Sequence, residues 1–142
     1  MLNLLVVNRF GVYHWNDYTF NDDTSIKDKY WIALNCTINQ KKYYAILPTS
    51  QYEKYNKQNK FILTDTIILN PSESEYFSKK TVLDLKNLKT NSIDEIRNAF
   101  ELNKFKYLGV LEKEIQNSII NTIKNAETLS NKTIKILLCE EV

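Results

Sequence analysis

Hydrophobic and polar positions alternate along much of the first two-thirds of the chain, a pattern typical of strands that bury one face. The alternation is clearest in residues 12–18. There Tyr13 and Trp15 share one face, while Val12 and His14 share the other. This segment is therefore predicted to be a strand.

Further segments along the chain are rich in β-forming residues. We expect strands over residues 30–38, 42–47, 61–69 and 81–88. The first two are separated by a short polar stretch, so they are expected to pair as an antiparallel hairpin. Residues 21–28 and 51–60 are polar and are predicted to be loops.

Helical signals come in the last third of the chain. Ser92 followed by Glu95 forms a capping-box pattern, which predicts a short helix directly after it. A longer helix is predicted over residues 111–126, with one apolar stripe that faces the core or a partner. The stripe consists of Leu111, Ile115, Ile119, Ile120 and Ile123. Residues 133–138 are rich in β-branched side chains and are expected to form a last strand.

Together these elements predict a mainly β (α+β) fold. The expected architecture is a small curled antiparallel sheet with one main helix near the C-terminus and a short additional helix. A chain of 142 residues suggests one domain, 1–142, and can bury about two-thirds of the surface that its unfolded form exposes. No internal repeat or linker is evident in the sequence.

Charge adds one local feature. The net charge of +2 does not by itself mark a nucleic-acid binder. Residues 24–60, however, hold seven lysines against two acidic residues. This basic segment could meet phosphates, and a solvated lysine-rich loop is the alternative.

The cysteines and the apolar segments bear on the compartment. Cys36 and Cys139 lie far apart, without the spacing of a zinc site or a redox motif, and are expected to be small buried thiols in a reducing compartment. No apolar stretch approaches the length of a membrane span, and no export signal is evident. A cytoplasmic location without membrane contact is therefore expected.

Four sequence blocks stand in a distinctive order. Within residues 11–35, a strand leads into Asp-Tyr-Thr-Phe at 17–20, a polar loop, Lys27, the pair Lys29-Tyr30 and a second strand. The remaining blocks are Ala-Ile-Leu-Pro-Thr-Ser at 45–50, residues 80–90, and Gly-Val-Leu at 109–111 before the long helix. In order and spacing, the blocks resemble the PemK/MazF family of ribonuclease toxins.

The resemblance implies a barrel of the SH3-like, CcdB/PemK-like type. It also implies a metal-independent endoribonuclease toxin that cleaves single-stranded mRNA by attack of the ribose 2′-hydroxyl and arrests growth. The implied partners are the RNA substrate, a cognate antitoxin (a protein, or an RNA as the alternative) and a second copy of the chain. No cofactor is implied.

Two departures from the family pattern keep alternatives open. Lys29 and Tyr30 stand where the family has arginine and proline, and lysine cannot make the planar forked phosphate contact of arginine. One alternative is therefore a relative that has lost activity. The other is a non-enzymatic toxin that resembles the gyrase poison CcdB and acts by binding a protein.

The resemblance places the catalytic residues at Lys29, Thr49 and Ser50. Lysine is ordinarily protonated at neutral pH, so the expected role of Lys29 is to stabilise the charge that develops on the phosphate. Thr49 and Ser50 could donate hydrogen bonds to phosphate oxygens from a turn whose backbone N–H groups also point outward. Taken alone, both are also ordinary turn residues.

Further residues are candidates for RNA binding. They are Lys27, Tyr18, Phe20 and Lys54, with the two aromatic residues stacking on bases. His14 is the one histidine, but its place on a strand face favours packing over proton transfer. Asp22 and Asp23 lack a third carboxylate at ligand spacing, so no metal site is predicted.

Overall fold

The computed structural model describes residues 6–19, 26–35, 41–50 and 63–140. The strands are β1 (Gly11–Thr19), β2 (Ile26–Ala33), β3 (Lys42–Ile46), β4 (Thr66–Leu69), β5 (Thr81–Asp84), β6 (Lys89–Ser92) and β7 (Phe105–Val110). The α-helices are α2 (Ile93–Glu101), α3 (Lys113–Lys124) and α4 (Asn131–Leu137). Short 3₁₀ turns cover Pro71–Glu73 and Leu85–Asn87.

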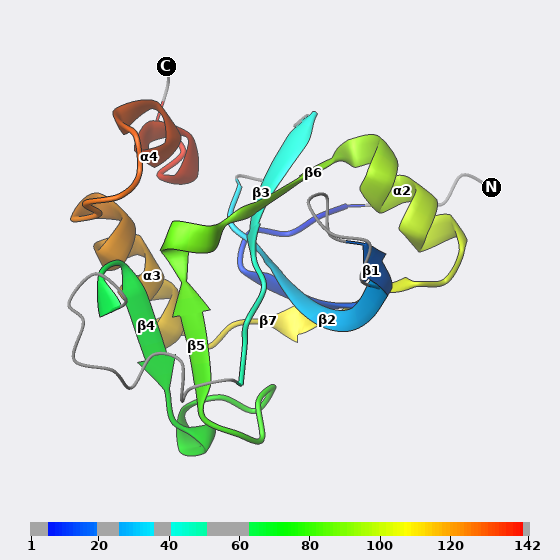
Figure 1. Cartoon of the computed structure of the whole chain (residues 1–142), viewed down its shortest axis with the longest axis horizontal. Coiled ribbons are helices and arrows are strands. Elements are labelled where there is room, and N and C mark those ends of the chain that lie inside the picture. The colour runs from blue at the N-terminus through cyan, green and yellow to red at the C-terminus, as the bar shows by residue number, and fades with distance from the viewer. Residues whose placement is uncertain (1–5, 20–25, 36–40, 51–62, 141–142) are drawn as a thin grey trace.

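The strands form an α+β fold around a five-stranded antiparallel sheet in the order β6-β3-β2-β1-β7. β4 and β5 form a separate antiparallel ribbon beside it (Figure 1). A single bridge between Thr49 and Val82 links the segment after β3 to that ribbon. Over the described residues the sheet is open rather than a closed barrel, with β6 and β7 at its edges.

Both faces of the large sheet are buried, because successive residues of a strand point to opposite sides. On one face Val12 and Ile32 belong to an aliphatic core that includes the buried isoleucines of α3. On the other face Tyr13 and Trp31 belong to an aromatic core covered by α2. The two helices accordingly lie on opposite sides of the sheet in Figure 1.

A bulge in β1 changes the direction of its last residues. Asp17 has φ 56°, and the register with β2 shifts between Trp15 and Tyr18. Simple alternation would place these two aromatics on opposite faces, but the extra residue returns Tyr18 to the side of Trp15. Their rings meet edge to face at 4.9 Å between centroids.

Local signals predicted several elements correctly. The first strand, the hairpin of β2 and β3, and α3 with its buried apolar stripe are confirmed. The capping box is also confirmed: the Ser92 hydroxyl accepts from the Glu95 N–H, and the Glu95 carboxylate accepts from the Ser92 N–H. These features depend on residues close in sequence.

The expected strand over residues 133–138 is wrong, because these residues belong to α4. The Ser130 side chain caps the helix by accepting from the Thr133 N–H, and Leu137 is buried in the aliphatic core. The Arg9 guanidinium donates to the carbonyls of Leu137 and Leu34, which places a cation at the helix C-terminus. Capping and docking thus outweigh the β propensity of the segment.

Cys139 also departs from expectation. It takes part in a disulfide bond and is exposed, so it is not a buried thiol. It occupies the left-handed position (φ 63°) after α4, where hydrogen bonds from Cys139 and Glu140 back to Ile136 and Lys135 close the helix. The other cysteine, Cys36, lies outside the described residues.

Other predicted boundaries are shifted. β2 begins at Ile26, inside the segment expected to be a loop. Of the expected strand 61–69, only Thr66–Leu69 is extended within the described residues. The next strand ends at Asp84, whose side chain accepts from the Lys86 N–H and starts a 3₁₀ turn. None of the helices in the described part of the chain combines the length and apolar character needed to cross a bilayer.

Candidate functional site

An open cleft of about 280 Å³ lies where the ends of β2 and β3 meet the connection between β4 and β5. Three stretches of chain supply its walls. They are Asp28, Lys29 and Tyr30; Pro48, Thr49 and Ser50; and Tyr76, Phe77, Ser78, Lys79 and Thr81. The three predicted catalytic residues therefore share one cleft.

The hairpin register explains why the first two walls meet. β2 pairs with β3 through Ile32 opposite Ile46 and Ala33 opposite Ala45. Continuing this antiparallel register toward the chain ends places Lys29 opposite Thr49. The observed pairing ends at Ile32 and Ile46, and the backbone of Thr49 is bridged to Val82, so both the hairpin and the β4–β5 ribbon position Thr49.

The backbone of Thr49 is held in place from the far side. Its N–H donates to the Val82 carbonyl at 3.1 Å, and its carbonyl accepts from the Val82 N–H at 2.8 Å. The expectation that backbone N–H groups of this turn point outward is therefore wrong for Thr49. The chemistry that Thr49 can offer a ligand is that of its side-chain hydroxyl.

The third wall, residues 76–81, was not predicted as part of the site. The residues that directly precede this wall are held by Glu112, at the start of α3. The Glu112 carboxylate accepts from the Ser74 hydroxyl at 3.0 Å and from the Glu75 N–H at 2.8 Å. The Tyr76 hydroxyl donates to the Val110 carbonyl at 2.9 Å. The available sequence signal was the run Tyr-Phe-Ser-Lys, in which aromatic residues adjoin a cation.

Charge in the cleft is mixed, with cations in excess. Lys29 and Lys79 contribute two positive charges, and Asp28 contributes the one carboxylate among the described lining residues. Asp28 accepts a hydrogen bond from the Asp17 N–H at 3.0 Å, which connects it to the bulge of β1. Hydroxyl groups surround these charges, so the cleft suits an anionic, hydrogen-bonding ligand such as a phosphate.

Tyr30 forms the aromatic part of the cleft with Phe77. Their rings are 5.5 Å apart at 90°, and His14 meets Tyr30 from the neighbouring strand at 5.5 Å and 76°. Phe77 is buried, whereas Tyr30 keeps 36% of its surface exposed. His14 packs beside Tyr30 and does not line the cleft, which agrees with its interpretation as a packing residue.

The predicted RNA-binding residues are not gathered here. Tyr18 is only 2% exposed, and its hydroxyl donates to the buried Asn91 side chain, so its prediction as a base-stacking residue is wrong. The β1 bulge is the cause, since it turns Tyr18 into the aromatic core. Lys27 is exposed on β2 but does not line the cleft. Phe20 and Lys54 lie outside the described residues.

A second hollow of about 240 Å³ lies between the end of β1 and α2. At its base, Asn91 accepts from the Tyr18 hydroxyl and the Trp31 indole and donates to Glu95. Burial raises the pKa of Tyr18, while its hydrogen bond to Asn91 acts in the opposite direction. These polar groups satisfy one another, which favours a structural role for this hollow.

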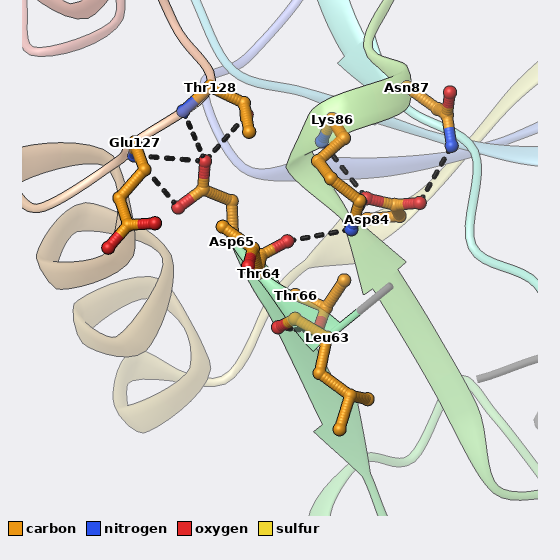
Figure 2. A network of polar contacts seen from close by, with 9 residues as sticks. All are labelled: Leu63, Thr64, Asp65, Thr66, Asp84, Lys86, Asn87, Glu127 and Thr128. Atoms are coloured by element: carbon orange, nitrogen blue, oxygen red, sulfur yellow. Dashed lines mark hydrogen bonds and ion pairs between the residues drawn. The ribbon is translucent and has the colours of Figure 1, made fainter. Parts of the chain in front are cut away.

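A further polar network joins β4 to the helical end of the molecule (Figure 2). Asp65 accepts hydrogen bonds from the backbone of Glu127 and from both the backbone and the hydroxyl of Thr128. Buried Asp84 pairs with Lys86 at 3.0 Å, and Lys86 also donates to the Thr64 carbonyl. The network connects β4 and the turn after β5 to the segment between α3 and α4.

Among the described residues, no group of three or more histidine, cysteine, aspartate or glutamate side chains is placed to hold a metal ion. Comparison with known proteins found no family model that matches the chain and no curated protein with a significantly similar sequence. The properties of the cleft therefore carry the functional argument.

Proposed function

We propose that this protein is a PemK/MazF-like endoribonuclease toxin that cuts single-stranded mRNA without a metal ion. One observation carries the proposal: Lys29, Thr49 and Ser50, chosen from sequence, line the same cleft. Lys79, on the third wall, adds a second cation. We propose further that the curled sheet is of the SH3-like, CcdB/PemK-like type.

The proposed reaction is an in-line transfer at phosphorus. The ribose 2′-hydroxyl loses its proton to an acceptor and its oxygen bonds to phosphorus. The bond from phosphorus to the 5′-oxygen breaks, and the 5′-oxygen takes up a proton from water. The products are a 2′,3′-cyclic phosphate and a 5′-hydroxyl. Lys29 stabilises the negative charge that grows on the phosphate oxygens, and the hydroxyls of Thr49 and Ser50 donate hydrogen bonds to them. These contacts act most strongly at the transition state.

The reaction also needs an acceptor for the 2′-hydroxyl proton. Asp28 is the candidate, because it is the carboxylate among the described cleft residues and precedes Lys29 directly. Its hydrogen bond from the Asp17 N–H restrains the side chain at the edge of the cleft. Its place in the same cleft as Lys29 and Thr49 is the support for this role, since a general base is chosen on position first.

As a toxin, the protein would act in the cytoplasm, as a homodimer, under the control of a cognate antitoxin that is a protein or an RNA. A CcdB-like toxin that only binds a protein does not require two lysines and several hydroxyls in one cleft. The contents of the cleft therefore favour the nuclease.

The test is incubation of the purified protein with a long single-stranded RNA in EDTA, followed by analysis of the product ends. We expect cleavage with 2′,3′-cyclic phosphate ends, and growth arrest when the protein is induced in cells. Cleavage that EDTA abolishes and Mg²⁺ restores would refute the metal-independent mechanism. A folded protein that leaves the RNA intact would support the inactive relative instead.

A further inference from the structure

Most aromatic side chains in the described part of the chain are buried. Trp31, Trp15 and Tyr18 are 0%, 7% and 2% exposed in the aromatic core. Tyr30 differs, because it is 36% exposed and lines the cleft. It is also the residue directly after Lys29.

The Tyr30 ring is held by its surroundings. His14 and Phe77 meet it at 76° and 90°, so neither is stacked parallel on the ring. Phe77 is part of the aliphatic core, and Glu112 ties down the segment that precedes it. A ring fixed in this way loses little conformational freedom when a ligand stacks on it.

We propose that Tyr30 is the platform on which an unpaired base of the RNA stacks, in the cleft that Lys29 and Thr49 also line. The inference rests on the proposed function for the position of the phosphate. It deepens that function by naming the residue that recognises an unpaired nucleotide at the cleft. A base inside a duplex is covered on both faces by its neighbours and cannot meet the ring.

The consequence is selection for single strands by shape. Stacking tolerates any base because every base has a flat face, so Tyr30 favours unpaired RNA without reading its sequence. Any sequence preference would then come from other walls of the cleft.

The probe is a short single-stranded oligonucleotide that carries 2-aminopurine and has hydrogen in place of each 2′-hydroxyl, so that it cannot be cleaved. Stacking quenches 2-aminopurine fluorescence. We expect quenching by the wild type and by Tyr30→Phe, which keeps the ring. Tyr30→Leu should lose the quenching and weaken binding by roughly 5- to 150-fold, the range for loss of one stacked base.

Tyr107→Leu is the matched control, since Tyr107 is 53% exposed on β7 and does not line the cleft. It should leave quenching and affinity unchanged. A thermal melt checks each variant, and Tyr30→Val, which retains a strong β-former, replaces Tyr30→Leu if the latter melts early. The same probe annealed to its complement should bind weakly and equally to all variants.

The outcomes separate this inference from the nuclease proposal. Quenching that depends on Tyr30, in a protein that leaves RNA intact, would support the stacking platform and reject the nuclease. RNA cleavage by the wild type, together with undiminished quenching by Tyr30→Leu, would support the nuclease and reject the stacking platform. Absence of quenching with the wild type, or an equal loss in Tyr107→Leu, would overturn the stacking platform.

Discussion

Lys29 and Thr49 line the same cleft, on the walls formed by β2 and by the segment after β3. Each has a separate structural support: Lys29 is on β2, and the Thr49 backbone is bridged to Val82. A thermal melt is therefore needed for each variant at these positions, to separate an effect on the reaction from an effect on the fold.

Lys29→Met and Thr49→Ala should each lower the cleavage rate by roughly 10²–10³, as for loss of one electrostatic donor at a transition state. The double variant should lose less than the product of the two, because groups that act as a unit are not additive. Lys29→Arg should retain or raise activity, since arginine contacts phosphate with a planar fork. Stability should change by only about 0.5 kcal/mol.

Growth arrest, RNA cleavage and a thermal melt for each variant make up the measurement. If Lys29→Met and Thr49→Ala stay folded and fully toxic, the proposed site is wrong.

Asp28→Asn should lower the rate by roughly 10²–10⁴, the usual contribution of a general base. Asparagine keeps an oxygen that can accept from the Asp17 N–H, so the β1 bulge should persist. Asp94→Asn, an exposed change on α2, is the control and should be silent. Wild-type kinetics for Asp28→Asn would exclude Asp28 as the proton acceptor.

Tyr13 should make the stability of the folded protein depend on pH in the alkaline range. Burial raises the pKa of Tyr13 to about 12, from its usual value of 10.0. Because the folded state favours the neutral phenol, this stabilisation is complete below pH 10.0 and is lost as pH rises toward about 12. Between pH 10.0 and about 12, Tyr13→Phe should lose less stability than the wild type. It should also cost about 1 kcal/mol at neutral pH, since the Asn8 N–H loses its acceptor.

Urea unfolding from neutral pH to about pH 12 measures this. Tyr107→Phe, which removes an exposed hydroxyl, should keep the wild-type profile. If Tyr13→Phe has the same dependence of stability on alkaline pH as the wild type, Tyr13 is not its cause.

At the scale of elements, polar contacts decide how the ribbon and the helices join the sheet. Asp65 reaches from the start of β4 to the segment between α3 and α4 through its bonds to Thr128 and Glu127 (Figure 2). Its backbone carbonyl also accepts from the Leu85 N–H, after β5. One residue therefore connects three parts of the chain.

The Asp65 carboxylate should make this junction sensitive to acid. Burial opposes its ionisation, but hydrogen bonds from Thr128 and Glu127 and the charge of Lys86 outweigh it and hold the pKa below 3.8. The stabilisation is thus complete above pH 3.8 and is lost as pH falls through the lower folded-state value.

Asp65→Asn tests this contribution, because asparagine tolerates the left-handed backbone of this position (φ 54°) while it removes the charge and one of the two accepting oxygens. We expect a loss of about 1–2 kcal/mol at neutral pH and a flatter profile below pH 4, by analogy with hydrogen bonds to charged groups. Denaturant unfolding should show that Thr128→Val adds little to Asp65→Asn. If the stability losses of Asp65→Asn and Thr128→Val add fully in the double variant, the two side chains do not stabilise the fold through their mutual hydrogen bond.

At the scale of the whole molecule, one sheet separates two cores. The isoleucine stripe of α3 is buried within the chain, in the aliphatic core, and so does not provide a face for a partner. The expectation of a homodimer therefore rests on the family resemblance alone. Light scattering at micromolar concentration should give the mass of a dimer, and a monomer would count against the proposal.

What the sequence determined by itself is the set of local structures. The alternation of β1, the hairpin of β2 and β3, the capping box of α2 and the stripe of α3 each depend on residues near one another in the chain. The approach of β2 and β3 is local in the same sense, whereas the position of Thr49 also depends on its bridge to Val82.

Only the tertiary structure decided the rest. β6 pairs with β3, and β7 pairs with β1, across long stretches of sequence. Neither short strand was predicted, because such pairing depends on residues far away in the chain and not on the local hydrophobic pattern. The third wall of the cleft joins the site through contacts with Glu112 and Val110, far along the chain. The exposure of Tyr30 and the burial of Tyr18 depend likewise on a bulge and on distant packing. Propensity and periodicity report neighbours in sequence, whereas burial is set by what the whole fold brings against each side chain.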